Sequence, residues 1–500
     1  MFARNKIKAT GLVLLSFLIV WGFYWWAFGG RIVTWDGVPQ LLQIIGIDNP
    51  NDFQTYSATA IMGIFIKLSA KFTSNVNHQI IFYVMVQLLT SIVAVTFIVV
   101  DLLSNGFKKA GWFAWLFYLL FPLFPLYAIA FDKSGYFMVG SALFALSVLM
   151  LQKTGKRVKY GLVGVLGATL MILFRDDGVY IVVATLGFMV LFSRLRKSFL
   201  IMLGVAFLLF VGVTKVWYPN VPVQHANGGG AALSLPTQQL ARIQKYGGRI
   251  DRETYTGLNE YLPMAELKDK YDENYADPVK FSYRYKVATT TGKTKNPEKT
   301  KSDVEAGLNK YPTGRFVKLW FKAVSENKRI ALESVLRGVD AYFLPTGKVN
   351  ESSYLGQLYF GVSTPDTRSG WQNLWGHYIP GLTIYGNNNA KLANDFKNMI
   401  FNLPSLLLFK HVIFAAWTYT WLLVGISFVA LIRFVKVKKY MFANFGVAVL
   451  GIAALGIAML SPIDGAMRYV MTIIVSLPVL FAMAGMNEYN KTTANESVSD

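Results

Sequence analysis

The sequence contains no cysteine and only four histidines among its 500 residues. A chain without cysteine cannot form disulfides, thiolate nucleophiles, cysteine-ligated zinc or iron–sulfur clusters. The histidines are scattered along the chain, which disfavours a metal site built from imidazoles. They are His78, His225, His377 and His411.

Charged residues are also scarce, because Asp, Glu, Lys and Arg together make up 15% of the chain while hydrophobic residues make up 54%. A soluble domain is nearer a quarter charged. The apolar residues form uninterrupted runs close to the thickness of a bilayer, such as Gly11–Phe28 and Phe199–Val213. We therefore predict an all-α polytopic membrane protein with about ten transmembrane helices and an α-rich extracytoplasmic region.

The predicted spans are residues 9–29, 79–103, 111–131, 134–152, 160–174, 178–193, 198–217, 406–432, 440–460 and 469–486. The first span ends in Trp25-Trp26-Ala27-Phe28, which is bulky where a signal peptidase needs small residues. We expect a retained anchor rather than a cleaved signal peptide.

The net charge of +21 comes partly from Lys and Arg in the N-terminal tail and in alternate short connections. This placement follows the positive-inside bias of membrane proteins and argues against a nucleic-acid partner. We expect both termini in the cytoplasm of a bacterial cell, the chain in its plasma membrane, and the non-basic connections outside. The predicted divisions are 1–217 (about seven spans), 218–405 (extracytoplasmic), 406–486 (about three spans) and 487–500 (a disordered cytoplasmic tail).

Four outward-facing connections hold nearly all the acidic residues that lie next to predicted spans. Charges at membrane depth are energetically unfavourable and are usually retained for contact with an ion or substrate. The connections are Thr34-Trp35-Asp36-Gly37, Phe131-Asp132-Lys133-Ser134, Phe174-Arg175-Asp176-Asp177-Gly178 and Ser461–Arg468. We predict that they converge on the outer face and that the turn Arg175–Gly178 lies below that surface, in a polar cavity.

The chain lacks a phosphate-binding Walker loop and a dinucleotide-binding glycine fingerprint. An enzyme of this kind would take its activated donor through the membrane, and a lipid phosphate fits that route. Group transfer from such a donor needs a carboxylate to accept the proton of the acceptor hydroxyl, and cations to hold the phosphate. Asp36 is the candidate base, Lys133, Arg175 and Arg468 are the candidate phosphate ligands, and Asp132, Asp176, Asp177 and Asp464 are candidate supporting acids.

The order of these segments resembles the plan of the GT-C superfamily, which transfers sugars from polyprenyl phosphates. Within that plan the chain resembles the bacterial DUF6020-like multi-spanning family. The similar stretches are Thr34–Gln40, Phe121-Pro122 with Asp132-Lys133, Phe174–Tyr180, Ser234–Arg242 and Asp464–Tyr469. The resemblance implies a GT-C-like fold, Asp36 as catalytic base, a polyprenyl-phosphate-sugar donor and an acceptor that is a cell-wall polymer, surface polysaccharide or lipid.

Each candidate also has a structural interpretation. Asp36 could cap a helix, Lys133 could pair with Asp132, Arg175 could be neutralised within its own turn, and Arg468 could pair with Asp464. A divalent cation could bind the carboxylates of Asp36, Asp132 and Asp177. The remaining candidate substrate contacts are Gln40, Gln238, Gln239 and Arg242, although Ser234–Arg242 also has the pattern of an amphipathic helix.

Other functions remain open at this level. A transporter or flippase of lipid-linked oligosaccharides would need charges along a path across the bilayer and, commonly, repeated halves. A polymerase of such oligosaccharides would share the donor lipid and the outer-face site. A non-catalytic scaffold would leave the charged turn at Arg175 unexplained.

Overall fold

The computed structural model of the chain describes residues 6–34, 36–51, 54–221, 233–280, 282, 313–345, 379, 381–383, 385–386, 388–403, 406–435, 445–461 and 463–485. The predicted cytoplasmic tail, 487–500, lies outside these residues, as do long stretches of the predicted extracytoplasmic region.

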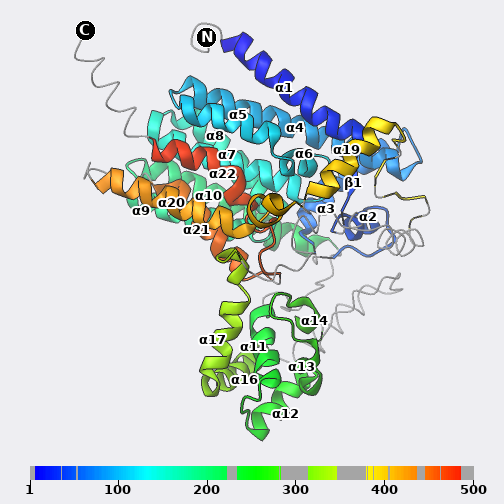
Figure 1. Cartoon of the computed structure of the whole chain (residues 1–500), viewed down its shortest axis with the longest axis vertical. Coiled ribbons are helices and arrows are strands. Elements are labelled where there is room, and N and C mark those ends of the chain that lie inside the picture. The colour runs from blue at the N-terminus through cyan, green and yellow to red at the C-terminus, as the bar shows by residue number, and fades with distance from the viewer. Residues whose placement is uncertain are drawn as a thin grey trace.

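The described residues are mainly helical and form a membrane-type bundle with a smaller helical unit below it (Figure 1). The N-terminal part of the bundle contains α1 (Lys6–Ala27), α2 (Gly37–Ile44), α3 (Tyr56–Ser69), α4 (Val76–Ser104), α5 (Lys108–Leu120), α6 (Leu123–Ala128), α7 (Ser134–Thr154), α8 (Arg157–Phe174), α9 (Gly178–Phe192) and α10 (Arg196–Val211). The C-terminal part contains α19 (Lys391–Asn402), α20 (Ala416–Val435), α21 (Gly446–Met459) and α22 (Met471–Ala484). The two short strands are β1 (Ile32–Val33) and β2 (Ala130–Phe131).

Six of the described helices are long and apolar enough to cross a membrane. They are α1, α4, α7, α8, the continuous helix Arg196–Trp217 that includes α10, and the segment Ala416–Arg433 of α20. Four further apolar helices are shorter, namely α3, α9, α21 and α22. These lengths support a helical multi-pass membrane protein.

The segment 111–131, predicted as one span, is divided in the structure into α5 and α6. Pro122 explains the break, because the residue before a proline avoids the helical conformation. Phe121 accordingly has extended backbone angles, φ −76° and ψ 113°. The prediction of a single continuous helix here is wrong.

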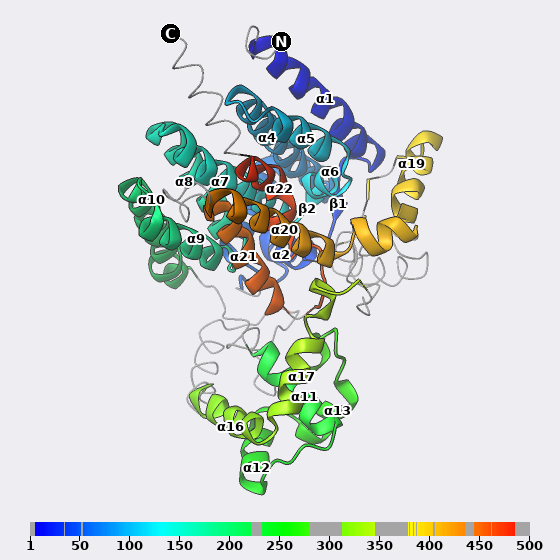
Figure 2. The same cartoon turned by 60° about the vertical axis from the view of Figure 1, so that its left-hand side comes forward.

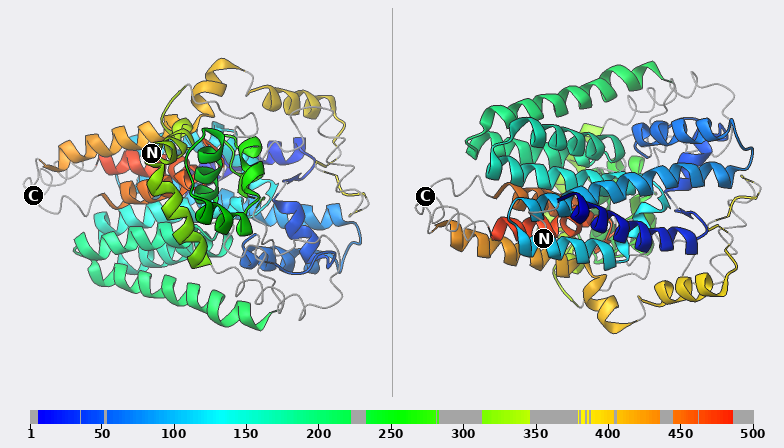
Figure 3. Two further views of the ribbon diagram at one scale, coloured as in Figure 1. Left: turned by 90° about the horizontal axis from the view of Figure 1, so that it is seen from below. Right: turned by 90° about the horizontal axis from the view of Figure 1, so that it is seen from above.

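The smaller unit comprises α11 (Ser234–Lys245), α12 (Arg252–Tyr261), α13 (Leu267–Lys270), α14 (Asp277–Lys280), α16 (Thr313–Glu326) and α17 (Lys328–Arg337), and is called the α11–α17 unit. It has a hydrophobic core separate from that of the bundle, formed by residues such as Leu240, Leu258, Tyr261 and Phe316. The unit lies below the bundle in both side views (Figures 1 and 2). Seen along the vertical axis, it projects over the middle of the bundle, whose long helices run roughly alongside one another (Figure 3).

The connection between α21 and α22 joins the bundle to the α11–α17 unit. The Asp464 N–H donates to the carbonyl of Asn274 over 3.0 Å, and Tyr275 forms an isolated β-bridge with Ile463. The Tyr342 hydroxyl donates to the carbonyl of Ile463 over 3.2 Å. This connection, which includes Arg468, is therefore held by the α11–α17 unit and by the turn Asp340–Tyr342 that follows α17.

The pairing of β1 with β2 aligns two of the predicted functional connections. The strands are parallel, with Ile32 opposite Ala130 and Val33 opposite Phe131. Each strand is followed within a few residues by a helix start, α2 after β1 and α7 after β2. The side chains at the ends of both strands therefore meet at one edge of this small sheet.

Gly37 allows this close approach. A Cβ atom at Gly37 would lie 2.0 Å from the carbonyl oxygen of Phe131, which is far inside van der Waals contact. We expect Gly37→Ala to destabilise the protein by about 1–3 kcal/mol and to lower its unfolding temperature. Gly63→Ala in α3 is the matched control, because a Cβ there meets Ile44 at an ordinary 3.5 Å. Equal unfolding temperatures for the two variants in thermal denaturation would contradict this reading.

Candidate functional site

Four of the predicted functional residues immediately precede helices or lie within three residues of a helix start. Asp36, Lys133 and Asp177 directly precede α2, α7 and α9, and Arg468 precedes α22. The N-terminal end of a helix presents unpaired N–H groups and a partial positive charge. Helix starts that converge in this way provide an environment that favours negative charge.

Asp36 and Arg468, although 432 positions apart in the sequence, form an ion pair. Nη1 of Arg468 donates to Oδ2 of Asp36 over 2.8 Å, and the two side chains are only 15% and 11% exposed. Nη2 of Arg468 donates to the Tyr469 hydroxyl over 2.8 Å. The first and last predicted functional connections therefore meet in the fold.

Arg175 is neutralised within its own turn. Its Nε and Nη2 atoms donate to the two carboxylate oxygens of Asp177 over 2.9 and 2.7 Å. Its guanidinium also lies over the rings of Phe137 and Tyr469, 5.0 and 5.5 Å from their centroids. The bidentate pair and the two rings hold the guanidinium in one orientation. Asp176, in the same turn, is exposed.

Lys133 has a neutral hydrogen-bond partner, since its ammonium donates to the side-chain oxygen of Gln54. Its charge acts on Asp36 together with the charges of Arg468 and Arg175. Burial by itself raises the pKa of Asp36, but these positive charges and the hydrogen bond from Arg468 outweigh it and hold the pKa below its ordinary value. Asp36 is therefore ionised at neutral pH and surrounded by three cations.

Several polar atoms of this cluster have no hydrogen-bond partner among the described residues. These are Oδ1 of Asp36, two of the three N–H groups of Lys133, and the buried Nε of Arg468. One free acceptor thus lies in a cluster with several free donors. A ligand with a hydroxyl and an anionic group matches this set.

Asp132 has a local structural role in the described structure. Its carboxylate accepts from the N–H of Ser134 and, over 3.3 Å, from the hydroxyl of Thr34. These bonds fix the start of α7 and attach it to the end of β1. The side chain of Asp132 is buried and supports Lys133 through the backbone.

Asp464 lies at the junction with the α11–α17 unit. Its Oδ2 accepts from the N–H of Ala341 over 3.0 Å, while its Oδ1 is buried and has no partner among the described residues. Burial raises the pKa of Asp464 to about 8, and the neighbouring carboxyl of Asp340 adds to this rise. Asp464 is thus mostly protonated at neutral pH.

The raised pKa of Asp464 predicts a stability that falls with rising pH. Between the ordinary pKa of 3.8 and about 8 the folded chain holds a proton that the unfolded chain releases, so the stabilisation is lost as the pH approaches 8. We expect the unfolding temperature of the native protein to fall between pH 6 and pH 9, and that of Asp464→Asn to fall by about 2–4 °C less. Thermal denaturation across this range measures the difference, and parallel curves for both proteins would contradict the assignment.

The remaining predicted contacts lie away from the charged cluster or are engaged elsewhere. Gln40 is fully buried and donates to the Thr59 hydroxyl over 3.0 Å, leaving its own oxygen unpaired among the described residues. Gln238, Gln239 and Arg242 lie on α11 in the α11–α17 unit. Their hydrogen bonds go to that unit: Gln238 to the carbonyl of Asp272, Gln239 to the carbonyl of Ala331, and Arg242 to Tyr271 and Glu333. Their contact with substrate stays a prediction.

The described residues contain no group of three His, Asp or Glu side chains arranged to hold a metal ion. A cation bound by Asp36, Asp132 and Asp177 therefore has no preformed site in this part of the chain. Two of these carboxylates are instead paired with Arg468 and Arg175.

Sequence reasoning missed three residues of the cluster. Gln54 accepts the hydrogen bond of Lys133, Phe137 packs against Arg175, and Tyr469 contacts both guanidinium groups. Tyr469 could have been found as the aromatic neighbour of Arg468. Nothing in the local sequence of Gln54 or Phe137 marks them, because their partners come from other connections.

A family model described as "Family of unknown function (DUF6020)" matches residues 51–499. The chain belongs to the DUF6020 family. No curated protein and no solved structure matches it. The DUF6020 match includes Lys133, Arg175 and Arg468 but begins after Asp36, and it assigns no activity. Membership therefore confirms the predicted family, while the GT-C resemblance stays a prediction.

Proposed function

We propose that this DUF6020 protein is a membrane glycosyltransferase of the GT-C type. It would move a sugar from a polyprenyl-phosphate carrier to a surface glycopolymer or lipid acceptor outside the plasma membrane. The observation that carries the proposal is the free bonding capacity of one cluster, which combines an ionised carboxylate with a free oxygen and cations with free N–H groups.

The proposed reaction uses these groups in defined roles. The acceptor hydroxyl attacks the anomeric carbon of the donor sugar, and Oδ1 of Asp36 takes the hydroxyl proton. The bond between the anomeric carbon and the phosphate oxygen breaks, and the polyprenyl phosphate leaves with the bonding electrons. Lys133 and Arg468 bind the phosphate oxygens as their negative charge grows.

Arg175 has a different part in this proposal. The guanidinium edge formed by Nε and Nη2 is engaged by Asp177, so Arg175 acts on the phosphate mainly through its charge and by placing Tyr469. Asp132 and Asp177 position the two connections, and Asp464 joins the cluster to the α11–α17 unit.

The proposal includes a topology of about ten spans. The shorter helices α9, α21 and α22 would cross the bilayer, and α5 with α6 would cross as a broken pair. Both termini would be cytoplasmic and the α11–α17 unit outside. The cluster of Asp36, Lys133, Arg175 and Arg468 lies at one end of the bundle, which supports a transferase over a flippase, because a flippase would need polar groups along a full transmembrane path.

Mass spectrometry of polyprenyl-linked lipids and surface glycopolymers tests this function in native cells, in a deletion strain and in cells with Asp36→Asn. We expect the deletion and the substitution both to remove one sugar from the polymer and to accumulate the lipid-linked sugar. If deletion alters the glycans but Asp36→Asn does not, the base assignment is wrong and transport of the lipid is favoured. If neither changes the glycans, the proposed function fails.

A further inference from the structure

A groove between α5 and α22 lies far from the charged cluster. It is an open groove of about 540 Å³, lined by Lys108, Lys109, Trp112, Phe113 and Phe481. α5 begins at Lys108. Its C-terminal end is followed by α6 and then by β2, which leads to the charged cluster. The 13 residues of α5 separate the two regions by about 20 Å.

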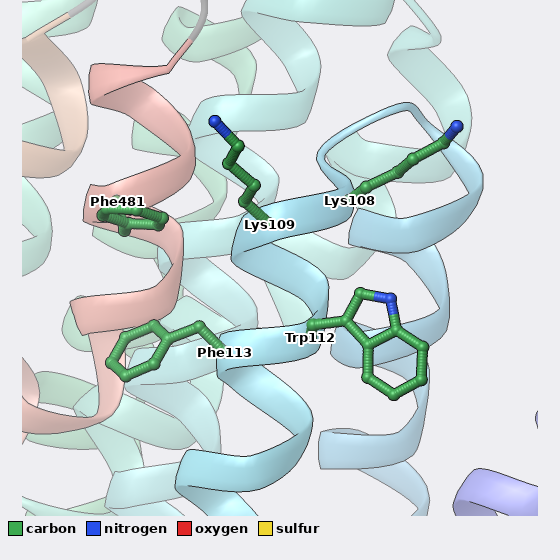
Figure 4. Close-up of a pocket in the computed structure, with 5 residues that line it drawn as sticks. All are labelled: Lys108, Lys109, Trp112, Phe113 and Phe481. Atoms are coloured by element: carbon green, nitrogen blue, oxygen red, sulfur yellow. The ribbon is translucent and has the colours of Figure 1, made fainter.

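The groove combines an apolar wall with a basic rim. Figure 4 shows the Lys108 and Lys109 side chains leaving the start of α5 in opposite directions, Lys109 towards α22 and Lys108 away from it, with the three aromatic rings below their ammonium groups. The Phe113 and Phe481 rings pack edge to face with centroids 5.9 Å apart, while Trp112 is 46% exposed. The rings thus form a surface that one hydrocarbon chain can cover.

The two lysines have no other described role. Both are exposed, and neither has a hydrogen-bond or ion-pair partner among the described residues. They are the first two residues of a 13-residue helix, where the free N–H groups also favour negative charge. Below them, Leu116 and Leu120 continue an exposed apolar face at 53% and 66% exposure. A basic rim above an apolar stripe matches a molecule with an anionic head and a long chain.

We infer that this groove is a binding site for an anionic phospholipid. The lipid phosphate would lie at the basic rim that Lys108 and Lys109 form, and one acyl chain would run over Trp112 toward Leu120. In the proposed topology this end of the bundle lies in the cytoplasmic leaflet, which carries the anionic lipids that attract basic residues. The site is separate from the proposed transferase site and does not depend on its activity.

Native mass spectrometry of the full-length protein tests this site with phosphatidylglycerol and phosphatidylcholine of equal chain length. We expect phosphatidylglycerol to bind more tightly than phosphatidylcholine. The double variant K108Q/K109Q should lower the affinity for phosphatidylglycerol by on the order of tenfold and change the affinity for phosphatidylcholine little. The matched control is K156Q/R157Q, an adjacent exposed basic pair at the start of α8. It should leave both affinities unchanged.

Two further experiments identify the ligand and the groove. Trp112→Ala should weaken the binding of both lipids, because it removes contact with the acyl chain and leaves the charge unchanged. Millimolar inorganic phosphate should fail to displace phosphatidylglycerol; full displacement would assign the site to a free anion and overturn the lipid proposal. Equal binding of the two lipids, or an equal loss in the control pair, would also overturn it. Thermal unfolding of each variant separates loss of binding from loss of fold.

Discussion

Asp36→Asn is expected to reduce sugar transfer by about 10²–10⁴-fold while leaving donor binding intact. The amide keeps the shape of the carboxylate and can still accept from Arg468, but it cannot take the acceptor proton. Because the amide carries no charge, it competes less with the donor phosphate for Arg468. Donor affinity should therefore stay equal or rise as turnover falls. Turnover and donor binding of the purified protein measure the two effects separately.

The pH profile gives a second readout for Asp36. Its pKa is held below the ordinary value of 3.8, so this group should stay ionised from pH 5 to pH 8 and impose no change on activity there. Activity should fall only under more acidic conditions, as the carboxylate is protonated. A steep rise in activity between pH 5 and pH 7 that Asp36→Asn abolishes would show that the electrostatic assignment is wrong.

Lys133→Met is expected to lower turnover by about 10²–10³-fold and to weaken donor binding, because it removes one phosphate ligand. This cation gives the clearest test. Its described partner is the neutral Gln54, whereas removing Arg175 or Arg468 would leave a carboxylate unpaired. The matched control is Lys71→Met, since Lys71 is exposed in the connection after α3. The control should retain activity.

Lys133→Arg separates charge from geometry. Burial lowers the pKa of Lys133 from 10.5, although the charge of Asp36 opposes this effect. The lysine should therefore lose its proton, and the enzyme its activity, at a lower pH than an exposed lysine would. Arginine stays charged, so Lys133→Arg should retain activity further into the alkaline range. Identical alkaline limits for lysine and arginine enzymes would exclude Lys133 as the titrating group.

Six of the ten predicted spans correspond to described helices that are long and apolar enough to cross a membrane, because membrane helices need long apolar runs. The division of 111–131 was also readable in principle, since Pro122 forces Phe121 out of the helical conformation. Span number was harder to predict. Helices such as α21 are apolar but have only 14 residues, and composition alone does not decide whether they cross a bilayer.

The sequence predicted the charged residues that meet in the cluster, but neither their pairing nor the neutral residues that contact them. The charges of Asp36, Lys133 and Arg175 stand out because each follows or precedes an apolar run. That Arg468 pairs with Asp36 rather than with Asp464 depends on packing between connections distant in sequence. Gln238 and Arg242 illustrate the converse, because their hydrogen bonds stay within the α11–α17 unit. A local motif does not reveal such partners.

The attachment of the connection before α22 to the α11–α17 unit limits how this protein can diversify. Asn274 of the unit bonds Asp464, the turn Asp340–Tyr342 after α17 bonds Ile463 and Asp464, and Arg468 lies a few residues further along. A chimera that exchanges the unit between family members must therefore keep these hydrogen bonds to Ile463 and Asp464. Without them the connection that carries Arg468 is no longer held in place. α12 lies at the end of the unit far from the bundle in Figures 1 and 2, so its sequence can be changed without altering these hydrogen bonds. The fold therefore tolerates sequence change around α12 and restricts it where the unit meets the connection before α22.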